Sequence, residues 1–293
     1  MTAGLPEIFA DAAVRGWVHA VPIRGPRTEI GLDADAPVVT ASVYKLPVMV
    51  TFCRLVDAGD LDPREPVTLD PDDRTPGPTG VSQFLDSVRM SLRDAVRSMM
   101  AVSDNAAADE VLRRVGVDRV NETMRMLGLR STRVLGGTAE ILQTLVDDTE
   151  TTSPAEAFAR IGDNDSVVRP TGYDPVLSSA TTARDMTTLL SAVWSGGAGS
   201  GEQTDFMRAV MSSQVFTARL RSGFPYSDVT VAGKTGTLGA VRNEVGVIEF
   251  PDGDAFAVAV FTRAARADPL LPRADAAIGG AARAAVAELR RLG

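Results

Sequence analysis

Cysteine and histidine are almost absent from this chain of 293 residues, which contains one of each, Cys53 and His19. A single cysteine excludes an internal disulfide, and its place in the apolar run 46–56 is typical of a small core residue. One histidine and one cysteine are too few ligands for a zinc or other soft-metal site, so we expect no metal and no cofactor. They also argue against a catalytic triad, because His19 would have to serve as its base.

Long apolar runs and an excess of positive charge are missing as well. No stretch approaches the roughly 18 apolar residues of a membrane span. The net charge of −8 and the pI of about 4.8 argue against nucleic acid and anionic membranes as partners. Residues 1–7 lack the basic and apolar segments of a secretory signal. We therefore expect a monomer in the cytoplasm that acts on a small molecule, or a secreted protein if a leader has been trimmed.

Lysine is scarce too, since only two of the 30 basic residues are lysines, Lys45 and Lys234. Arginine can supply a positive charge, but a guanidinium does not release its proton near neutral pH. A lysine can do so when it is buried or lies beside another cation. A GC-rich genome would explain the many arginines. It would not explain why both lysines fall within short motifs where chemistry can use an amine.

Apolar periodicity and turn residues place strands at both ends of the chain and helices between them. The polar, turn-rich stretch 146–172 predicts a long loop with one short helix near 154–161. We expect an α+β fold of the broad α/β class, in which one antiparallel sheet from both ends of the chain is flanked by terminal helices and joined to an all-helical lobe. Residues 1–293 would form one domain, with a sheet lobe from 1–40 and 200–293 and a helical lobe from 41–199. The expected strands are 16–23, 28–32, 230–238, 243–250 and 255–262, and the expected helices are 5–14, 42–58, 91 onward, 106–115, 120–128, 182–194, 203–214 and 273–292.

Three short motifs occur in order along the chain: Ser42-x-x-Lys45, Ser103-Asp104-Asn105 and Lys234-Thr235-Gly236. A Ser-x-x-Lys arises by chance about once in such a chain, whereas each exact tripeptide arises in roughly one chain in twenty. Together they form the signature of class A β-lactamases and penicillin-binding proteins. With their flanking residues, the motifs make nearly the whole chain resemble this superfamily, with class A β-lactamase-like proteins the most similar. The resemblance implies a β-lactamase/transpeptidase-like fold and an active-site serine.

The first motif has a physical reason for its spacing. If Ser42 opens a helix, Lys45 lies one turn later on the same face, within reach of the hydroxyl. A neutral Lys45 amine could then take the Ser42 proton, and attack on a carbonyl would give an acyl-enzyme. Lys234 would lower the pKa of Lys45 as a nearby cation and attract an anionic substrate.

The resemblance assigns roles to the second motif and to the oxyanion hole. Ser103 would carry the proton to the leaving group, and Asn105 would hold Lys45 and the substrate amide. Asp104 would brace the loop. The backbone N–H groups of Ser42 and Thr237 would stabilise the oxyanion.

Substrate binding would fall to the third motif and its neighbours. Thr235, Gly236 and Thr237 would line the site, and the two threonine hydroxyls would clamp a substrate carboxylate together with Arg242. A surface strand arginine is the alternative interpretation of Arg242.

The chain departs from class A β-lactamases in one respect. Their Glu-x-x-x-Asn motif, whose glutamate activates the deacylating water, does not occur in residues 130–181. Glu140 is the nearest candidate for that base, although it could be a solvated carboxylate at a helix end. Asp174 is a second candidate, or part of an Asx-Pro turn.

The leading hypothesis is therefore an active-site serine hydrolase that opens β-lactam rings through an acyl-enzyme on Ser42. A related hypothesis is an intracellular esterase, amidase, DD-peptidase-like or acyl-transfer enzyme of the same fold. A third is a non-catalytic homologue that binds ligand in the retained pocket. The substrate would carry a reactive carbonyl and a carboxylate.

Overall fold

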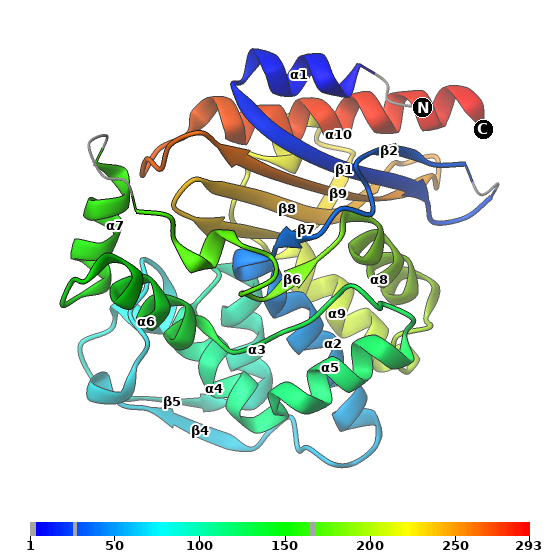
Figure 1. Cartoon of the computed structure of the whole chain (residues 1–293). Helices are drawn as coiled ribbons and strands as arrows, with labels where there is room; N and C mark the ends of the chain where they lie inside the picture. Colours follow the sequence, from blue (N-terminus) through cyan, green and yellow to red (C-terminus); the bar gives the residue numbers. More distant parts are fainter. Residues whose placement is uncertain (1–3, 26–27, 164–167) are drawn as a thin grey trace.

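The computed structural model describes residues 4–25, 28–163 and 168–293. Its centre is a five-stranded antiparallel sheet with the order β2-β1-β9-β8-β7. The prediction of one sheet built from both ends of the chain is thus confirmed (Figure 1). The strands are β1 (Val14–Pro22), β2 (Ile30–Leu32), β7 (Thr230–Leu238), β8 (Val241–Glu249) and β9 (Ala255–Ala264).

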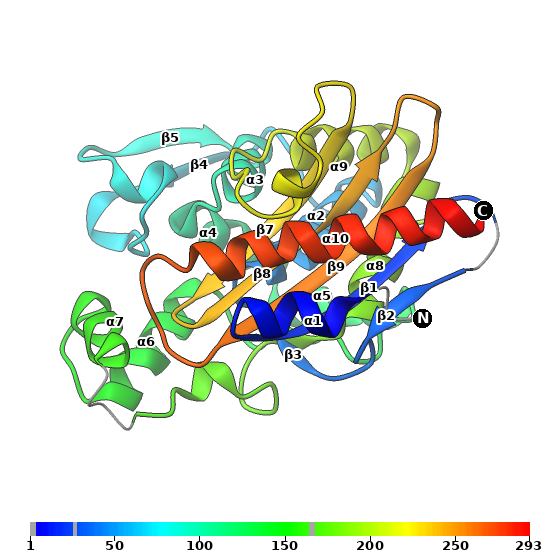
Figure 2. The same ribbon diagram turned by 90° about the horizontal axis from the view of Figure 1, so that it is seen from above.

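Two terminal helices cover one face of this sheet. The N-terminal helix α1 (Leu5–Asp11) and the C-terminal helix α10 (Pro272–Leu292) lie side by side across the strands (Figure 2). Alanine and other apolar residues recur along α10 and pack against the strands in one apolar cluster. No helix in the described part of the chain has an apolar stretch long enough to span a bilayer.

The helical part covers the other face. Its central helix, α2 (Lys45–Asp57), is buried at every position from 45 to 53, as expected for a helix surrounded by other helices. Around it lie α3 (Leu92–Ala101), α4 (Asn105–Val115), α5 (Val117–Met126), α8 (Ala183–Ser195) and α9 (Gly201–Ser212). Helices α6 (Thr138–Thr149) and α7 (Pro154–Gly162) pack together at one side (Figure 1).

Short elements complete the fold. Two small antiparallel sheets pair β3 (Val38–Val39) with β6 (Ala180–Thr181) and β4 (Pro66–Leu69) with β5 (Val88–Ser91). The 3-10 turns are η1 (Ala41–Tyr44), η2 (Pro71–Asp73), η3 (Gly80–Gln83), η4 (Thr171–Tyr173) and η5 (Leu220–Gly223).

Two sequence predictions were wrong in detail. Ser42 does not open an α-helix but lies in the 3-10 turn η1, and α2 begins at Lys45. The predicted loop 146–172 begins later, because α6 extends to Thr149, whereas the short helix expected near 154–161 is confirmed as α7. Helix α6 exposes a polar face, which hides the apolar spacing of Leu142 and Leu145. Residues 164–167 of that predicted loop lie outside the described residues.

Candidate active site

The three motifs meet at one cavity. Ser42, Ser103, Asn105, Thr235 and Thr237 all line a hollow of about 580 Å³. One wall is β7, the edge strand of the sheet, and the others are η1 and the start of α4. The five side chains named here are up to 195 positions apart in the chain, the separation of Ser42 and Thr237.

Backbone geometry brings η1 and β7 into close contact. A Cβ atom on Gly236 would lie 2.6 Å from the carbonyl oxygen of Thr40, so only glycine fits at this point of β7. Ala41 and Ser103 both have positive φ angles, 44° and 59°, which residues with side chains adopt rarely. Such conformations concentrate at functional sites, and here they adjoin Ser42 and Asn105.

The Ser103 hydroxyl joins the two lysines. Lys234 Nζ lies 2.9 Å from Ser103 Oγ, and Lys45 Nζ lies 3.4 Å from the same oxygen. Lys45 Nζ also donates to Asn105 Oδ1 at 2.9 Å and to the Ser103 carbonyl at 2.8 Å, while Lys234 donates to the Thr235 carbonyl at 2.8 Å. One hydroxyl thus lies within hydrogen-bond reach of two amines, as a proton carrier requires.

Both lysine side chains are completely buried. Burial lowers the pKa of Lys45 to about 7, against the opposing effects of Asp109 and Asp104. Burial also lowers the pKa of Lys234, and the positive charge of Lys45 lowers it further. The expectation that Lys234 depresses the pKa of Lys45 is not supported, because the lowering of this pKa comes from loss of solvation.

The Ser42 hydroxyl makes no hydrogen bond within the described part of the chain, and its side chain is partly exposed to the cavity. Lys45 lies three residues further on, and its amine contacts the Ser103–Asn105 segment. Catalytic hydrogen bonds are often long before substrate binds, so this arrangement is compatible with proton transfer from Ser42. The site therefore has a free hydroxyl in the cavity and, three residues further along the chain, a buried amine that can lose its proton near pH 7.

Asp104 braces the loop between α3 and α4. Its buried carboxylate accepts hydrogen bonds from Val81 N at 2.7 Å, from Ser98 Oγ at 2.6 Å and from the backbone N–H of Ala107. All of these partners are structural, so the carboxylate fixes the backbone that presents Ser103 and Asn105.

The orientation of β7 suits the predicted oxyanion hole. Thr235 N donates to Gln214 Oε1 at 2.7 Å, so this N–H points away from β8. Strand residues two apart direct their N–H groups to the same side. The Thr237 N–H therefore faces the outer edge of β7, where the cavity lies. The role of the Ser42 and Thr237 N–H groups stays a prediction.

The structure does not support Arg242 as the substrate clamp. Its buried guanidinium donates to the carbonyl oxygens of Val241 at 3.0 Å and Asp268 at 2.8 Å, and it does not line the cavity of Ser42. Arg219 lines that cavity instead, and its Nη2 donates to Thr237 Oγ1 at 2.7 Å. Sequence reasoning missed Arg219 because it lies in an irregular segment outside every motif.

Replacing Arg219 by glutamine should raise KM for a substrate that carries a carboxylate by about tenfold, because an ion pair with the substrate is lost. The KM for a neutral ester such as p-nitrophenyl acetate should change little. Steady-state kinetics with both substrates provide the test. Equal losses on the two substrates would indicate damage to the cavity wall, since Arg219 also bonds to Gly236 and Asp275.

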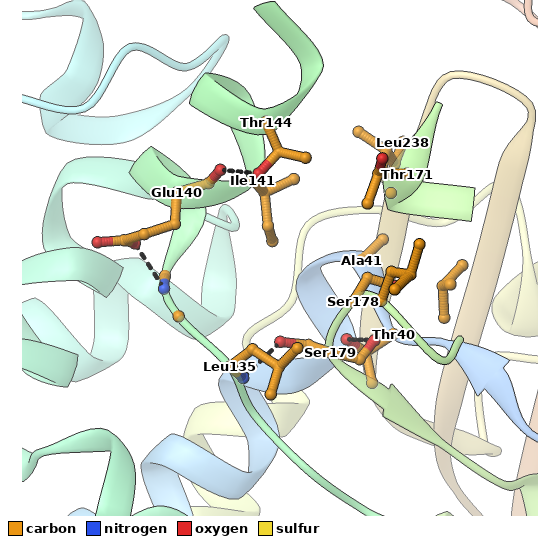
Figure 3. Close-up of a pocket in the computed structure, with 15 residues that line it drawn as sticks. Thr40, Ala41, Leu135, Glu140, Ile141, Thr144, Thr171, Ser178, Ser179 and Leu238 are labelled. Carbon is orange, nitrogen blue, oxygen red and sulfur yellow. Dashed lines mark hydrogen bonds between the residues drawn. The ribbon is translucent and has the colours of Figure 1, made fainter. Parts of the chain in front are cut away.

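Neither predicted base candidate lines the cavity of Ser42. Glu140 Oε2 accepts a hydrogen bond from Gly137 N at 2.8 Å, which caps the start of α6, and the side chain is exposed. Its carboxylate points away from Ala41 and Leu238 in a second, smaller cavity of about 100 Å³ (Figure 3). Asp174 accepts from Val176 N at 2.7 Å in an Asx turn. The structure therefore gives both carboxylates local structural partners.

Helix α6 contributes Thr138, Ile141 and Leu142 to the cavity of Ser42, and the polar one, Thr138, was not singled out by sequence reasoning. Its Oγ1 lies 2.9 Å from the Tyr44 hydroxyl and 3.5 Å from Asn105 Oδ1. Asp109 holds this helix start, because its carboxylate accepts from Thr138 N at 2.7 Å and Ala139 N at 2.8 Å. The two glycines before Thr138 were the sequence signal that could have predicted a close contact of this backbone with another segment. A Cβ atom on Gly137 would lie 2.3 Å from Asp109 Oδ1.

Comparison with known proteins agrees with this geometry. A model of the "Beta-lactamase enzyme family" matches residues 3–289. The chain is 30% identical over 270 residues to "Beta-lactamase regulatory protein BlaB" of Streptomyces cacaoi, covering 87% of this chain and 86% of that protein.

Solved structures show the same fold. A β-lactamase from Sphaerobacter thermophilus DSM 20745 superposes with a TM-score of 0.78 at 24% identity, covering 99% of this chain and 97% of that one. A mutant of PBP-A, solved as its acyl-enzyme complex with penicillin G, gives a TM-score of 0.77 at 19% identity and covers 98% and 96% of the two chains.

Proposed function

Because this chain belongs to the beta-lactamase enzyme family and is a serine hydrolase of the β-lactamase type, we propose that Ser42 opens β-lactam rings and that release of the acyl group limits turnover. The observation that carries this proposal is the shared hydroxyl of Ser103, 2.9 Å from Lys234 Nζ and 3.4 Å from Lys45 Nζ beside the free Ser42 hydroxyl.

Acylation would begin when the neutral amine of Lys45 accepts the proton of Ser42 Oγ. The oxygen attacks the ring carbonyl, and the resulting oxyanion meets the N–H groups of Ser42 and Thr237. The C–N bond of the ring then breaks, and the nitrogen takes a proton from Ser103 Oγ. The ammonium of Lys45 returns a proton to Ser103. The product is an ester on Ser42 with an opened ring.

Deacylation needs a water molecule and a base to activate it. Among the described residues that line the cavity, the carboxylate present belongs to Asp275, and Arg219 Nε binds it at 2.6 Å. Where α6 approaches Asn105, the chain has the hydroxyl of Thr138 and the apolar side chains of Ile141 and Leu142. The hydroxyl of Thr138 is a weak base, and the side chains of Ile141 and Leu142 are apolar. We therefore expect the ester on Ser42 to hydrolyse slowly.

Incubation with benzylpenicillin should increase the mass of the protein by the full mass of the drug, and the adduct should lie on Ser42. This adduct should form faster than it decays. Intact-mass spectrometry measures the adduct, and chromatography measures the ring-opened acid. The free drug should fall by a burst of one equivalent, and the acid should then appear only slowly, at the rate at which the adduct decays. If neither adduct nor acid forms, Ser42 is not acylated by β-lactams and the proposal fails.

A second candidate follows from the same missing carboxylate. If the ester on Ser42 never hydrolyses, the chain would act as a one-time acyl sensor; its relative in Streptomyces cacaoi carries the name of a regulatory protein. The same experiment separates the two, because a sensor gives one equivalent of adduct and releases no acid. Release of the acyl group to an added amine or alcohol, but not to water, would indicate an acyl-transfer enzyme.

A further inference from the structure

Glu244 is a buried carboxylate directly behind the cavity that the steps of acylation leave unused. It lies on β8 with 1% of its surface exposed. In the β7–β8 pairing it stands opposite Thr235, so the two side chains share the face of the sheet that α10 covers. The partner of Glu244 on the adjacent strand is thus the middle residue of the Lys234-Thr235-Gly236 motif.

Two hydrogen bonds connect Glu244 to the wall of the active site. Oε1 accepts from Gln214 Nε2 and Oε2 accepts from Leu220 N, each at 2.6 Å. Gln214 Oε1 in turn accepts from Thr235 N at 2.7 Å. These bonds fix both ends of segment 214–220, which contributes Phe216 and Arg219 to the cavity. Both oxygens of Glu244 meet N–H donors, which suits the ionised carboxylate.

The charged groups that act on Glu244 are cations. Arg219 and Lys234 both favour its ionised form. Glu244 in return favours the charged form of Lys234, against the repulsion from Lys45 and Arg219. The carboxylate of Asp275 is bound to Arg219 at 2.6 Å, and Arg242 on the same strand is bound to backbone carbonyls. Among the described groups that act on Lys234, Glu244 is the one that stabilises its positive charge.

We propose that Glu244 is a positioning residue of the reaction: its buried carboxylate is the counter-charge to Lys234, and it anchors the 214–220 wall through Gln214 and Leu220. This inference rests on the proposed function, because it explains how one lysine can serve as a base while its neighbour, which shares the Ser103 hydroxyl, remains a cation.

The pH dependence follows from the same contacts. Burial raises the pKa of Glu244 to about 7, opposed by the Leu220 N–H, Arg219, Gln214 and Lys234. As pH rises through about 7, Lys45 loses its proton in the same range in which Glu244 gains its charge. The new negative charge then holds the proton on Lys234 at the pH where Lys45 becomes the base.

The presence of only two lysines in the chain makes a direct test possible. Protein labelled with 13C at lysine Cε gives two side-chain signals, which Lys45→Met assigns. In Glu244→Gln the titration midpoint of Lys234 should fall by about one pH unit, because a buried opposite charge is lost. The rate of acylation by benzylpenicillin should match wild type at low pH and fall increasingly below it above pH 7. An unchanged Lys234 midpoint would overturn the proposal.

Gln214→Met is the matched control, since it removes the hydrogen bonds to Glu244 and Thr235 but keeps the charge. It should lower acylation at all pH values and leave the Lys234 midpoint in place; a shift as large as that of Glu244→Gln would overturn the proposal. If Glu244→Gln does not fold, the Lys234 signal of Lys45→Met decides, because without the titration of Lys45 it must still show a second inflection near pH 7 from Glu244; a signal without that inflection would overturn the proposal. The titrations do not depend on acylation, so a failure of the proposed function is seen separately, as the absence of adduct in wild type.

Discussion

Arginine at position 45 should slow the acylation of Ser42 by benzylpenicillin about 10²–10⁴-fold above pH 7, although it preserves a positive charge. In the wild type, burial lowers the pKa of Lys45 to about 7, so the neutral amine becomes the major form as pH rises above that value. The wild-type acylation rate should therefore increase with pH through about 7 and then level off. Arginine keeps its proton, so Lys45→Arg should lose the general-base contribution of about 10²–10⁴-fold and the rise with pH.

Stopped-time intact-mass measurements over a pH series provide this test, with Ser42→Ala as the variant that defines zero labelling. Melting temperatures separate chemistry from misfolding, because arginine is larger than lysine and position 45 is completely buried. Lys45→Met supplies a smaller, neutral comparison. Acylation of a folded Lys45→Arg protein at a wild-type rate would show that another group removes the Ser42 proton.

The sheet and most helices were predictable from local patterns. The strands of the C-terminal half alternate or run apolar between turn residues, and the observed β7 (Thr230–Leu238) coincides with the expected range. Helix α3 begins after Ser91, whose side chain accepts from Asp94 N as its sequence pattern predicts. The turn η1 was not predictable in this way, because the pattern of apolar residues continues from Val43 into α2. The 3-10 conformation occurs where the chain contacts β7, and that contact is not visible in the local sequence.

The centre of the site was predictable because its reactive residues lie within short contiguous motifs. Ser103 and Asn105 are adjacent to the buried brace Asp104, so one short segment places both. Arg219 and Arg242 could not be ranked from sequence, because both donate to backbone carbonyls and only the folded chain brings Arg219, and not Arg242, to the cavity and to Thr237 Oγ1. Glu140 was predicted as a base candidate from its position in the chain, but its carboxylate accepts a hydrogen bond from the Gly137 N–H. These outcomes depend on local hydrogen bonds that spacing does not encode.

Glutamate at position 138 should convert a slow acyl-enzyme into one that turns over. Thr138 lines the cavity of Ser42, and its Oγ1 is 3.5 Å from Asn105 Oδ1, which itself lies 2.9 Å from Lys45 Nζ. A longer side chain from this backbone position carries a carboxylate toward the ester on Ser42. General-base catalysis contributes about 10²–10⁴-fold, so we expect the rate of deacylation to rise by at least about a hundredfold while acylation changes little.

The measurement is the decay of the benzylpenicillin adduct after the free drug has been removed, followed by intact mass in Thr138→Glu and wild type. Thr138→Gln is the matched control, because it has the same length and shape but no base, and its adduct should decay as slowly as that of wild type. Both variants disturb the hydrogen bond between Thr138 and Tyr44 equally, so a stability loss common to the two does not affect the comparison. If Thr138→Glu folds, is acylated and still decays no faster than Thr138→Gln, the slow step is not the missing carboxylate. The apolar walls formed by Ile141 and Leu142, which keep water from the ester, would then be the cause.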